Sequence, residues 1–502
     1  VMCKDVLAAQ NHCHISPEET ELLLSPHNPI VLMEKRKAST IADNVSSDND
    51  YLGVMLPYTP IHILLMEIVD TLVMTSANIS DMPIISDDED AKANLADIAD
   101  YILMHNRKIH RRVDDSVYKV TNELPQAIRR ARGYAPGIVK ADKLKTPILA
   151  VGAELKNTFA VSRGSNIFVS PHIGDLKYAQ TYELFKQSIH EFKQLFGVSP
   201  KVVACDMHPG YLSTKWASES GHRVIKVQHH HAHLAATLLE YGIMDEPAIG
   251  FCMDGTGYGT DGAIWGCEAG IVSFKQFKRI SHLGYFALPG GDICAKDVYR
   301  CGVSLINQAV GRVDANQYEF LQDIASQNIQ VIQEMIEQNI NTVPTSSMGR
   351  LFDGVSSIIG LGSSSLYEAG AAIRLESVAD KSITDAYTVS LREYDGLHLW
   401  MWESMIGEIL LDLEEKTPIG TISAKFHNSV IEYIIKMTQI ISRQSGITKV
   451  ALSGGVFNNS LISDRAEALL RGNGYEVYLQ RTFPAGDGGL CIGQLIAANE
   501  VI

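Results

Sequence analysis

Two stretches of the sequence begin with the same pattern, an apolar strand followed by a tight polar turn and further strands. The first is PILAVGAELKNTFAVSRGSNIFVSP at 147–171, and the second is AIGFCMDGTGYGTDGAIWGCEAGIVSF at 248–274. Turn residues at 154–156 and 164–166 separate the apolar runs of the first stretch, as in a β-meander. This duplicated opening predicts a fold of two lobes.

The rest of the chain has an α/β pattern on both sides of a charged segment near 140–147. Before this segment, apolar strands alternate with helical patterns, at 29–33, 52–58, 71–78 and 96–107. After it, we expect a helix at about 179–196, a mostly helical region at 316–445, and an α/β end from 449. We therefore predict one α/β domain at 1–142 and a two-lobed domain at 146–502, with lobes of about 146–245 and 246–502.

Composition limits the classes of function. The 502 residues contain no run of 18 apolar residues and no signal-peptide pattern, so we expect a cytoplasmic protein without a membrane partner. The net charge of −15 disfavours a nucleic-acid binder. The segment 105–145 is an exception, with 11 Lys and Arg against 4 Asp and Glu. It is either a solvated surface or a site for a phosphate-rich small molecule.

The string VIKVQHHHAH at 224–233 is the strongest single signal for chemistry. An apolar strand leads into a helical pattern, and four imidazoles lie around the turn. His229 and His233 stand four apart, so on a helix they project from one face and are spaced to bind one metal ion. The alternative is a polar turn whose histidines cap a helix. His230 and His231 point elsewhere, and we assign them turn or substrate-facing roles.

Two carboxylates at other strand ends are candidates to complete this metal site. Asp254 follows the strand AIGFCM, and Asp487 lies in FPAGDGG before the last helix. Asp487 has an alternative role as a helix N-cap.

Three turns rich in glycine or small residues, AVGAELKNT, CMDGTGYGTDG and VALSGGVFNN, each follow an apolar strand. Glycine lets successive backbone amides approach a phosphate, although each turn alone could be an ordinary hairpin. Together they resemble the phosphate loops of the actin, sugar-kinase and heat-shock ATPase superfamily. In these turns, Lys156, Asn157 and Gly255 are candidate nucleotide contacts.

Several motifs occur in an order that resembles one family. VQHHHAH, MDGTGYG, ALPGGD, GRLFDGVSS, SGGVFNN and PAGDGGLCIGQ are similar to the C-terminal domain of hydrogenase-maturation carbamoyltransferases, the HypF family. VMTSANIS, HNRKIHRRVDDSV and RRARGYAP resemble the carboxylate-adenylating domain of that family. The resemblance implies a YrdC-like α/β domain followed by a two-lobed actin-like (ASKHA) ATPase fold.

The resemblance also implies roles for individual residues. His229, His233, Asp254 and Asp487 would bind one zinc or iron ion. Asn459 and the Gly454-Gly455 turn would contact the nucleotide, with Asp353 and Glu368 at the ribose. In the first domain, Ser76 and Asn78 would hold phosphate and acyl groups, and Arg130 and Arg132 match a basic closing segment. From the residues alone, Asp353 and Glu368 could be ordinary helix residues.

The family reaction makes carbamoyl-AMP from carbamoyl phosphate and ATP, with Mg²⁺, and transfers the carbamoyl group to a cysteine of the partner protein HypE. Family members begin with an acylphosphatase-like domain, a zinc module and a KGxGG-type turn, whereas this sequence opens at VMCKDVL inside the adenylating domain. We expect either that the chain is incomplete or that its adenylating site has lost part of its phosphate-binding contacts. Two other functions stay open: a tRNA threonylcarbamoyl-transferring enzyme, and a scaffold that binds metal and nucleotide without completing the first step.

Overall fold

The computed structural model describes residues 1–79, 82–142, 144–244 and 246–502. Ser80 of the VMTSANIS motif, Lys143 in the charged segment and Asp245 at the expected lobe boundary lie outside the described residues. The described residues form two compact units. The first unit comprises Val1–Val227 and Gln480–Ile502, and the second comprises Gln228–Leu479.

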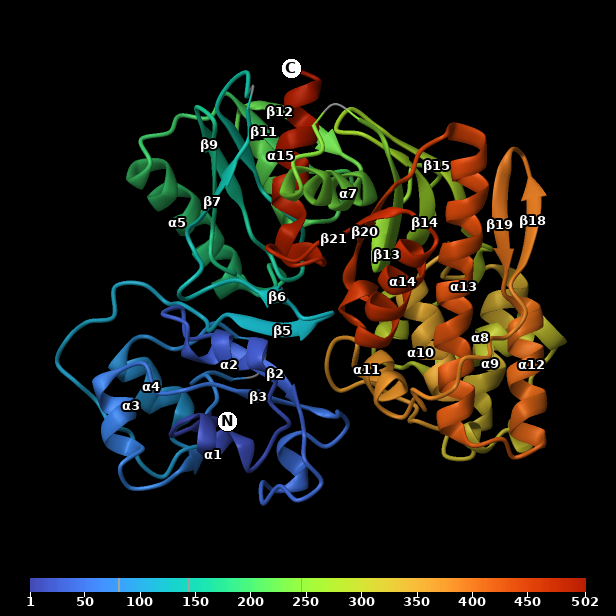
Figure 1. Cartoon of the computed structure of the whole chain (residues 1–502), viewed down its shortest axis with the longest axis horizontal. Helices are drawn as coiled ribbons and strands as arrows, with labels where there is room; N and C mark the ends of the chain where they lie inside the picture. Colours follow the sequence, from blue (N-terminus) through green and yellow to red (C-terminus); the bar gives the residue numbers. More distant parts are fainter. Residues whose placement is uncertain (80–81, 143, 245) are drawn as a thin grey trace. The chain divides into compact units, whose positions relative to one another are not determined.

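The first unit begins with a small mixed sheet of order β3-β2-β5-β6 (Figure 1). Strands β2 and β5 are parallel, whereas β2–β3 and β5–β6 are antiparallel. Its core contains Val31, Met33 and Tyr118, packed under Leu22 and Leu23 of helix α2. The elements of this part are β1 (Met2–Cys3), α1 (Val6–Gln10), α2 (Pro17–Leu24), β2 (Ile30–Glu34), β3 (Tyr51–Val54), α3 (Pro60–Leu65), β4 (Thr71–Leu72), α4 (Asp88–Leu95), β5 (Val117–Thr121) and β6 (Leu124–Arg129).

A second sheet of the first unit has the order β12-β11-β8-β9-β10-β7. Strands β8, β9 and β10 form the antiparallel meander predicted at 147–171. The last helix, α15, packs on β8 and β11. Gln480–Ile502 therefore belongs to this unit, and not with the predicted second lobe of 246–502. The elements are β7 (Gly137–Lys140), β8 (Ile148–Ala150), β9 (Ala160–Arg163), β10 (Asn166–Val169), α5 (Ala179–Leu195), β11 (Val202–Asp206), α6 (Leu212–Glu219), β12 (Arg223–Val227) and α15 (Leu490–Glu500).

The second unit is built on a large mixed sheet of order β18-β19-β15-β14-β13-β20-β21, with β16 and β17 joined to it through β14. Strands β13 and β20 are parallel neighbours, and helix α7 packs against both (Figure 1). The strands are β13 (Ala248–Tyr258), β14 (Ile264–Val272), β15 (Phe277–Leu283), β16 (Phe286–Pro289), β17 (Thr342–Thr345), β18 (Ser390–Tyr394), β19 (Leu397–Met401), β20 (Lys449–Ser453) and β21 (Glu476–Leu479).

Helices of the second unit cover this sheet with apolar faces. Long helix α13 contributes Phe426, Tyr433 and Met437 to one continuous core that also contains Phe251 and Leu452 of the sheet. The helices are α7 (His229–Glu240), α8 (Tyr299–Val310), α9 (Ser326–Gln338), α10 (Met348–Ile358), α11 (Gly370–Ser377), α12 (Glu403–Glu414), α13 (Ile419–Ser445) and α14 (Ser460–Gly472).

One expectation about local structure was wrong. The pattern at 96–107 contains neither helix nor strand, and its apolar side chains Tyr101 and Leu103 are exposed. A short apolar pattern forms stable structure only when it packs against a core, and this one does not. The region 316–445 is mostly helical, as predicted, with α9 to α13 in it, and β17 and the β18–β19 hairpin lie between these helices.

Gly454 fixes the end of strand β20 against β13. Its φ is +101°, and a Cβ there would lie 2.2 Å from the carbonyl oxygen of Met253. Only glycine combines that backbone conformation with so close an approach. Gly446, after α13, also has a positive φ of +75° but has open space around it.

We expect Gly454→Ala to lower the free energy of unfolding more than Gly446→Ala does. Both substitutions place alanine at a positive φ, a conformation that costs a residue other than glycine roughly 1–3 kcal/mol. Only Gly454→Ala adds overpacking, which costs roughly a further 1–3 kcal/mol. Urea unfolding followed by tryptophan fluorescence measures both, and equal losses would contradict this account of the turn.

Candidate metal centre and its surroundings

Helix α7 places two imidazoles on one face. Gln228 caps the helix, because its side-chain Oε1 accepts a hydrogen bond of 2.9 Å from the backbone N–H of His231. His229 and His233 are one helical turn apart, and their Nε2 atoms lie 3.2 Å from each other. Both side chains are buried, at 0% and 1% exposure. The helical spacing seen in the sequence therefore brings the two nitrogens together.

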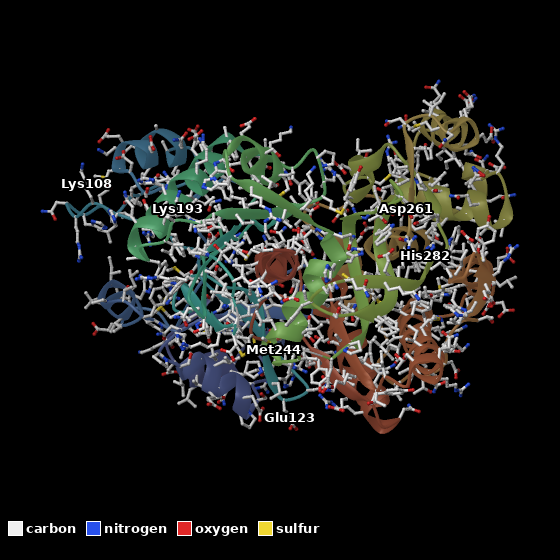
Figure 2. All side chains as sticks on the ribbon, turned by 90° about the horizontal axis from the view of Figure 1, so that it is seen from above. Lys108, Glu123, Lys193, Met244, Asp261 and His282 are labelled. Atoms are coloured by element: carbon white, nitrogen blue, oxygen red, sulfur yellow. The ribbon has the colours of Figure 1, made fainter. Side chains whose placement is uncertain are left out.

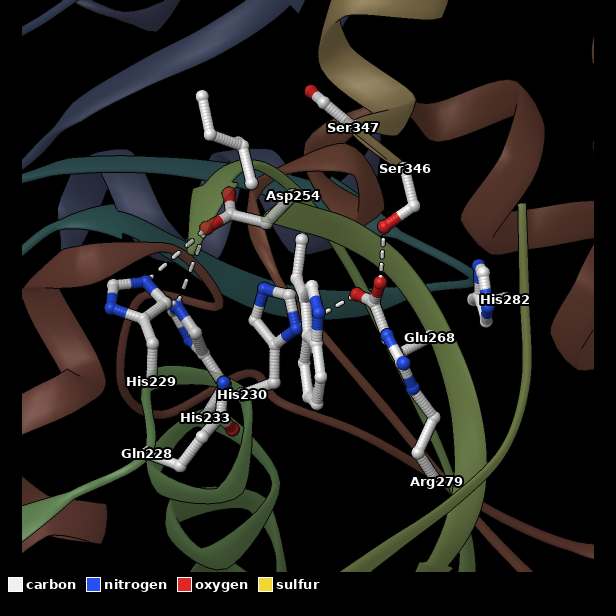
Figure 3. Close-up of polar contacts among 12 residues, drawn as sticks. Gln228, His229, His230, His233, Asp254, Glu268, Arg279, His282, Ser346 and Ser347 are labelled. Carbon is white, nitrogen blue, oxygen red and sulfur yellow. Dashed lines mark hydrogen bonds and ion pairs between the residues drawn. The ribbon is translucent and has the colours of Figure 1, made fainter. Parts of the chain in front are cut away.

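Asp254 faces these nitrogens from strand β13. Its Oδ2 lies 3.4 Å from His229 Nε2 and 3.6 Å from His233 Nε2 (Figure 3). Burial alone would raise the pKa of this carboxyl. The contacts with His229 and His233 outweigh burial and hold its pKa well below the ordinary value. Asp254 is therefore a buried carboxylate that is ionised at neutral pH.

A bulge in β13 aims Asp254 at α7. Met253 pairs with Cys267 and Gly257 pairs with Trp265, so Asp254–Thr256 face Gly266 alone. Such a bulge turns a side chain out of the regular strand pattern. A Cβ on Gly266 would lie 2.5 Å from the Asp254 carbonyl oxygen, so the bulge requires glycine opposite it.

Backbone and hydroxyl donors hold the bulge in place. The N–H of Gly455, in the turn after β20, donates a hydrogen bond of 3.1 Å to Asp254 Oδ1. Ser347 Oγ, at the start of α10, donates one of 2.6 Å to the carbonyl oxygen of Gly255. Predicted residues Gly255 and Gly455 therefore lie around the Asp254 carboxylate.

The chemistry of these donors fits a transition metal. One atom from each of His229, His233 and Asp254 lies within 4.8 Å of the others. Two neutral imidazoles and a carboxylate suit zinc or ferrous iron. Asp487 begins a 3₁₀ turn (Asp487–Gly489) of the first unit and is half-buried, and its role as a fourth ligand stays a prediction.

The two middle histidines point away from this cluster, as predicted. His231 Nε2 lies 2.9 Å from the carbonyl oxygen of Ser273. His230 Nδ1 lies 2.8 Å from Glu268 Oε2, and both side chains are fully buried (Figure 3).

The residues assigned to ribose occupy different environments. Asp353, on α10, is buried and lies 2.8 Å from Arg350 Nη2. Burial raises its pKa to about 6, against the opposing effect of Arg350. Glu368 is exposed in the turn before α11. Contact of either residue with a ribose stays a prediction.

Asn459 is fixed at both ends of its amide. Its Oδ1 accepts from the N–H of Ile462 and caps α14, and its Nδ2 lies 2.9 Å from His427 Nε2. His427 Nδ1 lies 2.7 Å from the Ser423 carbonyl oxygen, so this ring is neutral with its proton on Nδ1. Burial lowers the pKa of His427 to about 4.

In the first unit, Asn157 shapes the turn after β8. Its Nδ2 donates to the carbonyl oxygens of Val151 and Ala153, at 2.9 and 2.6 Å. Neighbouring Lys156 is exposed, with a positive φ of 45°.

The predicted residues of the adenylating domain each contact different protein groups. Ser76 is exposed, and Asn78 is half-buried with its Nδ2 donating to the carbonyl oxygen of Ile79. Arg130 donates to the Tyr134 carbonyl oxygen. Arg132 lies 2.8 Å from Asp115 Oδ1. The two arginines are thus held by protein groups.

Arg132 also stacks over the Tyr58 ring, at 3.5 Å, and Arg130 over the ring of Phe483, at 4.1 Å. Elsewhere in the basic segment, Lys108 is exposed at the periphery of the structure (Figure 2).

Sequence reasoning missed a cavity of about 810 Å³ in the first unit. Arg36, His12 and Thr71 are among the residues that line it. His12 Nε2 lies 3.2 Å from Thr71 Oγ1, and burial lowers the pKa of this histidine. The basic string EKRK at the end of β2 was the signal that could have identified Arg36.

Among the described residues, we find no helix long and apolar enough to cross a membrane.

Three family profiles match successive parts of the chain. Residues 1–131 match the Sua5/YciO/YrdC family, described as "Telomere recombination". Residues 143–240 match "HypF Kae1-like domain", and residues 250–494 match "Carbamoyltransferase, Kae1-like Domain, second subdomain".

Individual relatives agree with these profiles. The chain is 37% identical to "Carbamoyltransferase HypF" of Synechocystis sp. over 96% of its length, and 33% identical to the protein of that name from Rhizobium leguminosarum bv. viciae over 100%. It spans 65% and 66% of the length of those relatives.

A crystal structure of full-length HypF in a phosphate- and nucleotide-bound form superposes with a TM-score of 0.95 at 41% identity, covering 100% of this chain and 78% of the other. These matches confirm the predicted fold class, a YrdC-like α/β domain followed by an actin-like fold.

We expect acid to destabilise the protein through His427. Because its folded pKa of about 4 is below the ordinary 6.5, the unfolded chain takes up this proton first as pH falls. Stability present above pH 6.5 is lost between 6.5 and 4, by roughly 3 kcal/mol at most. His427→Gln should make the free energy of unfolding, measured in urea, less dependent on pH across this window, whereas His398→Gln on β19 should not. Identical pH profiles for wild type and His427→Gln would contradict the assignment.

Proposed function

The chain belongs to the HypF family of carbamoyltransferases, and from this membership we propose that it transfers a carbamoyl group through a carbamoyl-adenylate intermediate in NiFe-hydrogenase maturation. The observation that supports this most directly is the buried set of His229, His233 and Asp254 in the second unit, which offers a metal site between helix α7 and the bulge of strand β13.

We assign the formation of carbamoyl-AMP to residues 1–142. ATP with Mg²⁺ and a carbamate derived from carbamoyl phosphate would be the substrates. The cavity that contains Arg36 offers a permanent positive charge for a phosphate, and Ser76 and Asn78 follow strand β4, whose Thr71 also lines the cavity. Arg130 and Arg132 would act less directly, because protein groups already hold them.

We assign the transfer step to residues 146–502. A zinc or iron ion bound by His229, His233, Asp254 and Asp487 would supply Lewis-acid stabilisation of negative charge on the acyl group. Asp254 keeps its ionised form through the histidine contacts, and the Gly455 N–H fixes its second oxygen. Gly454, Gly455, Asn459, Lys156 and Asn157 would hold the adenylate phosphate, and Asp353 and Glu368 the ribose.

The acceptor thiol comes from a partner in this proposal. All eight cysteines are buried free thiols. Burial raises the pKa of Cys491 and of Cys13 to about 12, which is the opposite of what a nucleophilic thiolate requires. A cysteine of a HypE-type protein is therefore the acceptor that we propose.

A rival function is transfer of a threonylcarbamoyl group to tRNA. The net charge of −15 argues against a nucleic-acid substrate. A gel-shift with tRNA at physiological salt tests this rival, and specific binding would favour it.

Mass spectrometry of the acceptor tests the proposed reaction. After incubation with this chain, ATP and carbamoyl phosphate, we expect a gain of about 43 Da on one acceptor cysteine, the mass of a carbamoyl group replacing hydrogen. A parallel reaction supplied with synthetic carbamoyl-AMP isolates the transfer step. A gain only in the parallel reaction would show that the first step is inactive here, and no gain in either would support the scaffold alternative.

We expect His233→Ala to lose the metal and the transfer step while the fold persists, because a catalytic ion need not hold the fold together. The matched control is His231→Gln, which changes a neighbouring histidine whose Nε2 faces the Ser273 carbonyl oxygen instead. Metal content by plasma mass spectrometry and circular dichroism measure the two effects. Stoichiometric metal in His233→Ala would refute the ligand assignment.

A further inference from the structure

His230 lies between the two metal-ligating histidines in sequence but contacts a different part of the second unit. Its side chain is fully buried. Its Nε2 has no hydrogen-bond partner among the described residues. The ring edge faces Gly257, where a Cβ would lie 2.4 Å from His230 Nε2. Gly257 is the residue at which β13 returns to register after the bulge that presents Asp254.

The opposite edge of the His230 ring contacts a fixed carboxylate. His230 Nδ1 lies 2.8 Å from Glu268 Oε2, although the two groups are not aligned as in an ideal hydrogen bond. Ser346 Oγ donates to Glu268 Oε1 at 2.5 Å (Figure 3). Glu268 is on β14 and is fully buried, so it has little freedom to move.

The bulge is thereby contacted at both ends. Ser347 holds the carbonyl oxygen of Gly255, and the adjacent Ser346 holds Glu268, which contacts the ring that packs on Gly257. Asp254 directly precedes Gly255 and lies three residues before Gly257. A shift of the bulge would therefore move the Asp254 carboxylate relative to His229 and His233.

We propose that His230 is a positioning residue of the metal centre: supported by Glu268 and Ser346, it packs against Gly257 and keeps the β13 bulge in the shape that presents Asp254 to the ion. This inference rests on the metal centre of the proposed function. It assigns His230 no ligand bond and no proton transfer. This role explains why the buried His230 ring, in the HHHAH run, has a nitrogen that makes no hydrogen bond among the described residues and lies next to the Gly257 backbone.

Cobalt(II) binding to the whole chain tests this role without any assay of activity. The d–d absorption of Co²⁺ reports the ligand set, and its titration gives the affinity. His230→Asn retains a polar group near the position of Nδ1 but removes the ring edge at Gly257. We expect it to weaken Co²⁺ binding by roughly 10–100-fold and to change the spectrum, since groups that orient ligands have effects of that size. The metal-free melting temperature should change little.

A double-mutant cycle tests the contact itself. Gly257 has no positive φ in this structure, so alanine is unfavourable there chiefly because of the His230 ring. Gly257→Ala should lower Co²⁺ affinity at least about tenfold in the wild type, but less than about threefold in a His230→Ala background, where the ring is absent. His231→Gln is the matched control and should bind Co²⁺ as the wild type does.

The outcomes separate this inference from the proposed function. Equal losses from Gly257→Ala in both backgrounds, or wild-type affinity and spectrum in His230→Asn, would overturn the positioning role while leaving the metal centre intact. Retention of Co²⁺ by His233→Ala would overturn the metal centre itself. Loss of metal-free stability without loss of Co²⁺ affinity in His230→Asn would show a structural role only.

Discussion

The buried carboxylate of Asp254 makes contacts on which the centre of the second unit depends. A carboxylate in a water-poor interior is costly unless opposite dipoles or charges surround it. Asp254 has the two imidazoles on one side and the Gly455 N–H on the other. These contacts join α7, β13 and the turn after β20. The same contacts that offset the cost of burial therefore bring together the three side chains that we propose as metal ligands.

Glycine makes this assembly geometrically possible. Gly454 lets the turn after β20 approach the backbone at Met253, and Gly266 lets β14 pass under the bulge. Neither position has room for a Cβ. The string VALSGGVFNN, which was predicted to be a phosphate loop, therefore has a second role through Gly454, which is to let two backbones approach closely beside a charged side chain.

The residues that we assign to nucleotide binding lie in different environments. Asn459 and Asn157 have their amides engaged by protein groups, so any contact they make with a nucleotide would add to a structural role. Asp353 is buried beside Arg350, and its pKa of about 6 reflects a carboxyl that is taken out of water. No spacing in the sequence distinguished these environments, because burial depends on how segments distant in the chain pack together.

The sequence alone determined the meander at 147–171, the helix that begins at the histidine run, and the spacing that puts His229 and His233 on one face. These features follow from local periodicity, in segments that also pack against a core. Only the tertiary structure decided that a bulge in β13 brings Asp254 to that face, and that His230 lies between Glu268 and Gly257. Such contacts join residues far apart in the chain, and they depend on strand register and packing, which no local pattern encodes.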